Sequence, residues 1–392
     1  MAAVRQSGEA GWGSIAVMVG ASIFSAFQIG KVSVAIPSFQ QEFLLGLDAV
    51  GLLAGVIATI GTFAGMPVGA LVARFGDRRM LLCGFGVLAA ASAVGAVAAA
   101  FPLLIALRVL EGLGYLMIGV SGPTILQRIC SPTRRNSVLA VWSCGVPTGI
   151  ALAMVVGSWL GEWRMLWWFS AGLAALGAAL ILLVIPPAPP RQRGAPGSLM
   201  RHAIEVVSQP AVLMLAASFM LYSLTFFALV TFLPVLFIDR MRLAPGLSGW
   251  LSALAVFSNA IGNVGAGMLI QRGVGRRLVV IGAGIALAVL AGGIFLPGMP
   301  LAVVFTACLL SLAISGLIPA TIIASAPLVA PSPMLLPFVL GTFTQGANLG
   351  QIVGPTVVGA AIEAFGWPSA AACIAVASLF MAVIFRSIRR AL

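Results

Sequence analysis

Hydrophobic stretches recur at short intervals along the whole chain. Twelve can be counted, and each has about the 20 residues that a helix needs to cross a bilayer. Short polar or Pro- and Gly-rich segments separate them. The stretches lie near residues 14–38, 49–73, 79–99, 102–126, 137–160, 164–185, 210–237, 247–270, 278–297, 299–325, 337–361 and 367–387. The pattern predicts an all-α membrane protein with twelve spanning helices.

The composition agrees with this class. Hydrophobic residues make up 61% of the 392 residues and charged residues only 8%, whereas about a quarter of a soluble domain is charged. The cysteines show no CxxC spacing, which argues against disulfides and against a zinc site; they are Cys83, Cys130, Cys144, Cys308 and Cys373. We therefore expect no metal and no cofactor.

The longest predicted inner connection divides the chain into six stretches on either side. It covers residues 186–209 and opens with PPAPPRQRGAPG, a Pro- and Gly-rich sequence typical of linkers. We expect a first six-helix bundle at 1–185, a cytoplasmic linker at 186–209 and a second six-helix bundle at 210–392.

An internal repeat supports this division. Three landmarks recur at nearly constant offsets of 198, 201 and 204 residues: Gly69 with Gly267, Gly145 with Gly346, and Trp163 with Trp367. Parallel six-helix repeats are typical of one transporter architecture. The two halves are therefore predicted to be homologous.

The arginines predict the orientation. If both termini are cytoplasmic, sixteen arginines fall inside and three outside, and such an asymmetry sets topology. The inner set is Arg5, Arg74, Arg78, Arg79, Arg128, Arg134, Arg135, Arg191, Arg193, Arg201, Arg272, Arg276, Arg277, Arg386, Arg389 and Arg390; the outer set is Arg164, Arg240 and Arg242. We expect a multi-pass protein of the cytoplasmic (inner) membrane. Because the inner arginines are spread over six segments, the net charge of +12 does not indicate nucleic-acid binding.

Charged residues inside the stretches are the candidate functional groups. Lys31, the single lysine, lies within the first stretch, where a cation is unfavourable by roughly 2.5 to 3.5 kcal/mol. The fourth stretch holds Arg108, Glu111 and Tyr115 on one helix face. Lys31 and Glu111 agree in depth within roughly 3 Å. Two pairings remain open: Lys31 with Glu111, or Arg108 with Glu111 while Lys31 is left for a ligand.

Two motifs resemble those of the major facilitator superfamily, and the resemblance covers the full chain. After the second stretch, Gly69, Arg74, Gly76 and Arg78 match the family's signature loop. Ala73 stands at its acidic position, and Asp77 stands where the family has a basic residue. In the fourth stretch, Arg108 precedes Gly112 by four residues, as in the family's span-four motif.

The resemblance implies roles for these residues. The loop with Gly69, Arg74, Gly76, Asp77 and Arg78 would be a cytoplasmic latch that stabilises one conformation, with Asp77 a substitute for the missing acid. Arg108 would take part in proton coupling, and spans one and four would line a central cavity. The family also implies a transporter whose two halves rock about a fixed site, as a monomer in membrane lipid.

Small-residue ridges suit such motion. Spans two and eleven, which face each other in the family, carry one ridge each: Gly61, Gly65 and Gly69, and Gly346, Gly350 and Gly354. Static packing is the alternative explanation for each ridge.

The balance of buried charge suggests the substrate. The stretches contain the two cations Lys31 and Arg108 but only Glu111 as a clearly internal acid, which favours a small organic anion. Gln28 and Ser25 lie on the face of Lys31. Lys31, Arg108, Gln28 and Ser25 are predicted substrate contacts, and the further ones are Tyr115 in the first half and Tyr222, Gln345 and Asn348 in the second. Glu111 and Arg108 are the predicted proton-coupling residues.

We therefore expect a secondary active transporter that takes up a small organic anion with protons. The alternative is a proton-antiport exporter of a drug or metabolite, since Gly145 and Pro147 partly match the exporters' span-five motif. An enzyme is disfavoured because no histidine lies in any stretch. A channel is disfavoured because two internal halves supply a complete pathway, while a transporter-like receptor remains open.

Overall fold

The computed structural model describes residues 11–131, 138, 141–142, 144–187, 199–332 and 335–388. Every regular element within these ranges is a helix. The all-α prediction is therefore confirmed. The first half contains α1 (Trp12–Phe43), α2 (Leu47–Gly55), the 3-10 turn η1 (Val56–Ala58), α3 (Thr59–Phe75), α4 (Asp77–Ala96), α5 (Phe101–Ile129), α7 (Gly145–Leu160) and α8 (Trp163–Val184).

The second half begins after a short helix, α9 (Leu199–Val207). It contains α10 (Pro210–Asp239), α11 (Pro245–Gln271), α12 (Arg276–Phe295), α13 (Leu301–Ser315), α14 (Leu317–Val329), α15 (Leu336–Phe365) and α16 (Pro368–Ser387). Ten of the described helical segments are long and apolar enough to cross a membrane. Two of these segments run through consecutive helices, at Leu47–Gly65 and Leu301–Val329, and α7 is a shorter apolar helix. The 30-residue α15 covers the eleventh predicted stretch but is not among these ten.

Local chemistry explains where these helices end. Proline occupies the first turn of α5, α10, α11 and α16, where its missing N–H costs no helical hydrogen bond. Gly76 separates α3 from α4 with φ of +92°, a conformation that favours glycine. The second span is not one continuous α-helix, because η1 interrupts it between Gly55 and Thr59.

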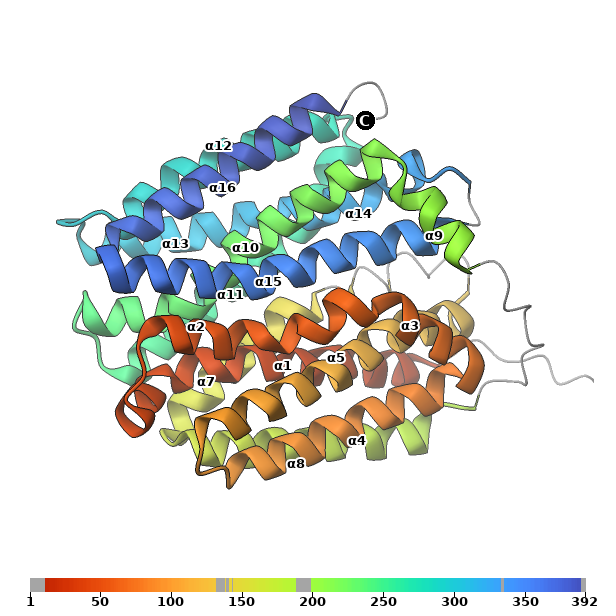
Figure 1. Ribbon diagram of the computed structural model, residues 1–392, viewed down its shortest axis with the longest axis horizontal. Coiled ribbons are helices and arrows are strands. Elements are labelled where there is room, and N and C mark those ends of the chain that lie inside the picture. Colours follow the sequence, from red (N-terminus) through yellow and green to blue (C-terminus); the bar gives the residue numbers. More distant parts are fainter. Residues whose placement is uncertain are drawn as a thin grey trace, which may run out of the picture.

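The helices form two groups (Figure 1). Helices α1 to α8 occupy the lower part of the view and α10 to α16 the upper part. We call the end with the α1–α2 connection the Gly46 end, and the opposite end, where α9 lies, the linker end (Figure 1). Of the expected linker, residues 188–198 lie outside the described residues, and α9 occupies most of the rest.

Apolar packing joins the halves. The largest buried hydrophobic cluster contains Ile29, Ile57 and Ile150 from the first half together with Leu229 and Val256 from the second. Helices α2 and α15 contact each other across this boundary, as do α7 and α11. The boundary is therefore a packed surface made by both halves.

The glycine ridge of α15 does not lie at this boundary. Side chains at Gly346, Gly350 and Gly354 would collide with backbone carbonyls of α10, which belongs to the same half. The second and eleventh spans do face each other, because α15 contacts both α2 and α3, but the glycine ridge of α15 faces α10. Its glycines let α15 approach α10 closely, and other residues of α15 meet α2.

Candidate functional site

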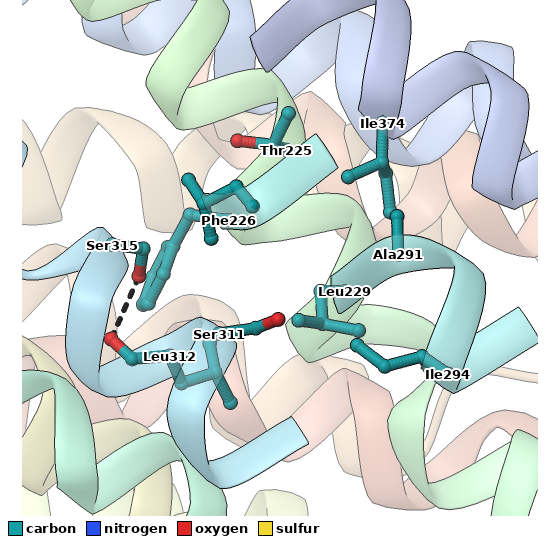
Figure 2. A pocket seen from close by; sticks show the side chains of 10 residues that line it. Thr225, Phe226, Leu229, Ala291, Ile294, Ser311, Leu312, Ser315 and Ile374 are labelled. Atoms are coloured by element: carbon teal, nitrogen blue, oxygen red, sulfur yellow. Dashed lines mark hydrogen bonds between the residues drawn. The ribbon is translucent and has the colours of Figure 1, made fainter. Parts of the chain in front are cut away.

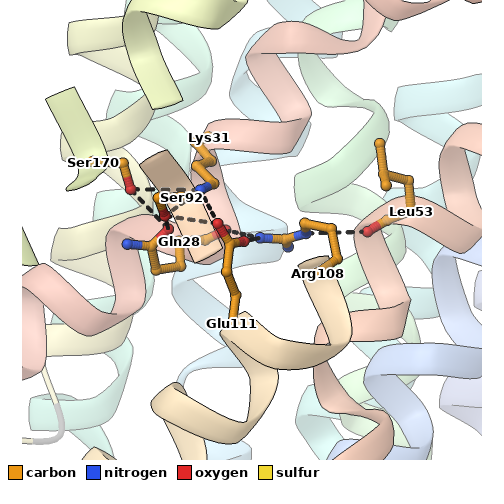
Figure 3. A network of polar contacts seen from close by, with 7 residues as sticks. All are labelled: Gln28, Lys31, Leu53, Ser92, Arg108, Glu111 and Ser170. Atoms are coloured by element: carbon orange, nitrogen blue, oxygen red, sulfur yellow. Dashed lines mark hydrogen bonds and ion pairs between the residues drawn. The ribbon is translucent and has the colours of Figure 1, made fainter. Parts of the chain in front are cut away.

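A polar network is buried between α1, α4, α5 and α8 in the first half (Figure 3). At its centre, Glu111 on α5 accepts from Lys31 on α1 through Oε1, and the Nζ–Oε1 distance is 2.5 Å. Its other oxygen, Oε2, lies 2.5 Å from Nη1 of Arg108, one turn earlier on α5. Both pairings left open by the sequence are thus present together, because one carboxylate holds both cations.

Hydroxyl groups complete the network. Ser92 on α4 donates to Glu111 Oε1 at 2.7 Å and is 3.1 Å from Lys31 Nζ. Ser170 on α8 donates to the Gln28 side-chain oxygen at 2.7 Å. The Lys31 ammonium also lies 4.2 Å from the ring centroid of Trp167, in cation–π geometry. Four helices of the first half are therefore tied together by one set of contacts.

The network is closed to solvent and contains two basic side chains for one acidic side chain. Lys31 and Glu111 have no exposed side-chain surface and Arg108 has 1%. Two cations share one carboxylate, and ions in low dielectric need good partners to offset their lost hydration. Arg108 donates to the Gln28 backbone carbonyl at 2.8 Å, but its Nη2 is buried without a hydrogen-bond partner. One donor of the network therefore remains available to an acceptor.

Arg108 also connects the network to the second span. Its Nε donates to the Leu53 carbonyl on α2 at 3.4 Å (Figure 3). This carbonyl lies just before η1, where the helix changes to 3-10 geometry. A short 3-10 stretch inside a helix often marks a hinge. A shift of Arg108 would therefore act directly on α2.

The remaining predicted substrate residues lie outside this network. Ser25 is buried and donates to the Ser22 carbonyl of its own helix. Tyr115 packs against the cluster that joins the halves, which also contains Tyr222. Asn348 on α15 lies against Gly61, and Gln345 lies one turn away against Gly65. The structure thus brings Gln28, Lys31, Arg108 and Glu111 together and leaves Ser25, Tyr115, Tyr222, Gln345 and Asn348 apart from them.

The predicted latch has a described partner. Asp77 is buried, and its Oδ2 accepts from Nε of Arg128 on α5 at 2.9 Å. Asp77 Oδ1 also accepts from the Arg78 backbone N–H at 2.6 Å, and Arg78 donates to the Leu182 carbonyl. These contacts join α4, α5 and α8 within the first half. The side chain of Arg74 and the surroundings of Gly69 lie outside what the structure describes.

Sequence reasoning missed Ser92, Ser170, Trp167 and Arg128. Isolated serines and tryptophans are common in membrane helices, so nothing in their sequence context singles out the first three. Arg128 was counted only as a topology signal. Its position at the end of the same span as Arg108 and Glu111 was the one available signal.

The second half has a counterpart of the network site without charge (Figure 2). A small pocket lies between α10, α12, α13 and α16, and none of its ten lining residues is charged. Four lining residues follow the network residues Lys31, Ser92, Glu111 and Ser170 by 198 to 204 residues, the offsets of the internal repeat; they are Leu229, Ala291, Ser311 and Ile374. In the second half, the corresponding four helices therefore pack around apolar side chains and hydroxyl groups in place of the charged network.

Comparison with known proteins places the chain in a family. The model of the Major Facilitator Superfamily matches residues 18–248 and 241–391. A chloramphenicol resistance protein of Streptomyces lividans is 28% identical over 393 residues, covering 95% of each chain. The 3-(3-hydroxy-phenyl)propionate transporter of Escherichia coli K12 is 25% identical over 305 residues, covering 71% of this chain and 73% of the relative.

A solved structure has the same fold. It is a bacterial homologue of the human lysosomal transporter Spinster, and it superposes with a TM-score of 0.75 at 15% identity, covering 95% of this chain and 94% of its own. The family model spans nearly the whole chain, and the helices long enough to cross a membrane agree with a multi-pass membrane protein. This chain belongs to the major facilitator superfamily of transporters.

Proposed function

We propose that the chain takes up a small organic anion together with protons, and that the buried network of Lys31, Arg108 and Glu111 couples the two. The observation that carries the proposal is the sharing of the Glu111 carboxylate by two cations in a site without solvent exposure. Buried charges of this kind often mark substrate or proton pathways in membrane proteins.

The second half argues against a purely structural role for these charges. Its corresponding four helices pack around Leu229, Ser311 and their apolar neighbours. Replacing buried ion pairs with apolar residues is often neutral or stabilising. Packing of this helix arrangement therefore does not require the ions, which supports a functional reason for them in the first half.

The charges also suggest the sign of the coupling. If Glu111 takes up a proton, the only carboxylate shared by Lys31 and Arg108 is lost, and two uncompensated cations remain. An anion then binds more favourably, and by reciprocity a bound anion favours the protonated carboxyl group. Proton and anion would therefore bind together, which is symport. The unpartnered Nη2 of Arg108 is the candidate donor to the anion.

The predicted substrate residues divide accordingly. Lys31 and Gln28 are engaged within the network, so we propose that they act through it. Tyr115, Tyr222, Gln345 and Asn348 remain candidates for contacts nearer the boundary of the halves, and Ser25 would act through α1. The Asp77–Arg128 contact is the proposed latch at the linker end.

For the membrane orientation and the domain boundaries, we propose what the sequence predicts. We propose cytoplasmic termini in the inner membrane, a first bundle at 1–185, a linker at 186–209 and a second bundle at 210–392, acting as a monomer. The Gly46 end would then face outward.

Labelling of single cysteines at Leu44 and Phe75 with a membrane-impermeant reagent tests this orientation. Only the cysteine at Leu44 should react in intact cells.

Export of a neutral drug is the second candidate. It is favoured by the chloramphenicol resistance protein, which covers 95% of this chain. A neutral substrate would gain nothing from the two basic side chains of the network. The two candidates therefore differ in what they predict for charged ligands.

A ligand screen separates them. Purified protein is heated with monocarboxylates, dicarboxylates, sulfonates, 3-(3-hydroxyphenyl)propionate or chloramphenicol, and the unfolding midpoint is followed. Stabilisation by a ligand scales as RT ln(1 + [L]/Kd), so weak ligands are visible at high concentration. Anion uptake predicts stabilisation by a carboxylate that is lost in Arg108→Met. Stabilisation by chloramphenicol alone contradicts the anion proposal and supports export.

A further inference from the structure

The N-terminus of α2 is capped by a side chain from the other half. Glu363, near the end of α15, accepts a hydrogen bond through Oε2 from the backbone N–H of Leu47 at 3.0 Å. Leu47 is the first residue of the nine-residue α2, and its N-cap, Gly46, has no side chain to cap it. A carboxylate at a helix N-terminus is favourable because it accepts from a free N–H and faces the positive end of the helix dipole.

The same two helices touch through their backbones along α2. A side chain at Gly51 would collide with the Pro355 carbonyl, and one at Gly55 would lie 2.8 Å from the Ile352 Cα. A side chain at Gly359 would lie 2.6 Å from the Leu47 carbonyl oxygen. Helix α2 therefore packs against α15 along its full length, and Glu363 extends this contact to the N-terminus of α2.

This contact lies at the Gly46 end and joins the two halves. A transporter that alternates by moving its halves must separate them at each end in turn. For the Gly46 end to open, α2 must leave α15, and the Leu47 N–H must leave the Glu363 carboxylate. The hydrogen bond seen here therefore belongs to a conformation in which this end is closed.

We propose that Glu363 is a positioning residue for transport, which holds α2 against α15 and stabilises the conformation closed at the Gly46 end. Its loss leaves the substrate-facing residues untouched and shifts the balance between the two conformations. Because Glu363 is exposed, its hydrogen bond is worth about as much as an ordinary helix cap, and its loss predicts about a threefold to tenfold fall in the closed-to-open ratio. The inference needs only alternating access and is independent of the identity of the substrate.

Spin-label distances across the contact test this. Labels are placed on cysteines at Leu44 and Phe365, which are 89% and 80% exposed, in a background without the native cysteines. Distance distributions are then measured in liposomes for the unchanged chain and for Glu363→Ala, Glu363→Gln and Glu363→Asp. We expect Glu363→Ala to move population to longer distances, Glu363→Gln to do so less because it keeps an acceptor oxygen, and Glu363→Asp least.

Glu205→Ala is the matched control, because Glu205 is an exposed acid on α9 at the linker end. It should leave the distances unchanged. The proposal is overturned if Glu363→Ala and Glu205→Ala give the same distribution as the unchanged chain.

A second pair of variants removes the same hydrogen bond from the other side. Leu47→Pro deletes the N–H at a first helical position, where proline is well tolerated. Leu47→Ala trims the side chain and keeps the N–H. We expect a larger shift for Leu47→Pro than for Leu47→Ala, and no further shift when Glu363→Ala is added to Leu47→Pro. Equal shifts for the two Leu47 variants, or full additivity with Glu363→Ala, contradict the proposal.

Discussion

Lys31 on α1 and Glu111 on α5 form an ion pair of 2.5 Å in which neither side chain has solvent exposure. Arg108 holds the second oxygen of the same carboxylate, so the three charges form one unit. Removing either member of the Lys31–Glu111 pair therefore has unequal consequences. Loss of the lysine leaves a neutral pair, whereas loss of the acid leaves two buried cations.

We expect Glu111→Gln to destabilise the protein more than Lys31→Met. The first change leaves Lys31 and Arg108 without a counterion, and breaking a buried pair in this way costs about 3 to 5 kcal/mol. The second leaves the Arg108–Glu111 pair and should cost about 1.5 to 3 kcal/mol, as for a lost hydrogen bond to a charged group. Thermal unfolding in detergent measures both, with Leu229→Met as the control at the corresponding position of the second half. The reverse order would contradict the shared-carboxylate description.

Replacing the whole network with apolar residues should restore stability but not transport. The triple variant Lys31→Leu, Arg108→Met, Glu111→Leu follows the second half, where Leu229 stands at the position that corresponds to Lys31. We expect its unfolding midpoint to lie above that of Glu111→Gln, because no ion is left unpaired. Transport of any substrate found for the unchanged chain should be lost. A triple variant that transports normally would show that the charges have no part in function.

The Asp77–Arg128 contact predicts coupling between two sites. Arg128 reaches both Asp77 oxygens, at 2.9 and 3.2 Å, and Asp77 is buried. We expect Asp77→Asn and Arg128→Ala each to lower the free energy of unfolding by about 1 to 2 kcal/mol. The double variant should cost clearly less than the sum, since either change already breaks the contact. A double-mutant cycle on thermal unfolding measures this, and strict additivity would mean that the pair contributes nothing.

Gly51 predicts a steric effect on the boundary of the halves. A methyl group at this position meets the backbone carbonyl of Pro355, which cannot move aside without separating α2 from α15. Gly51→Ala should therefore lengthen the distance between labels at Leu44 and Phe365 and slow transport. Gly86→Ala on α4 is the control, because a side chain there meets nothing within 4 Å. Unchanged distances in Gly51→Ala would mean that the closure does not depend on this contact.

The fold was largely predictable from the sequence, because spans must be long and apolar and breaks between them need proline, glycine or arginine. The equal depth of Lys31 and Glu111 was also predictable, since rise per residue converts sequence position into depth. The rotation of each helix about its axis was not. Rotation decides that Ser92 and Ser170 meet Lys31, and that Gly346 faces α10 instead of α2.

The sequence also could not predict where a helix is interrupted. Helix α2 ends at Gly55 and gives way to η1, although the hydrophobic pattern continues through Ala58. The hydrophobic pattern indicates which side chains prefer lipid or protein surroundings. It contains no information about hydrogen bonds made by backbone atoms. The donations from Arg108 to the Leu53 carbonyl and from the Leu47 N–H to Glu363 both involve backbone atoms, so no pattern of side chains could reveal them.

The central claim is that the Glu111 carboxylate couples protons to transport, and proton-driven uptake into liposomes tests it most directly. Liposomes contain the unchanged chain, Glu111→Gln or the double variant Lys31→Met/Glu111→Gln, which keeps the same net charge in the network. Uptake of a carboxylate identified by the ligand screen is measured with and without a pH gradient, beside exchange without a gradient. The account predicts that the unchanged chain accumulates the anion when a gradient is applied, while the double variant exchanges it without accumulation. Equal gradient-driven accumulation by the double variant and the unchanged chain would contradict the account.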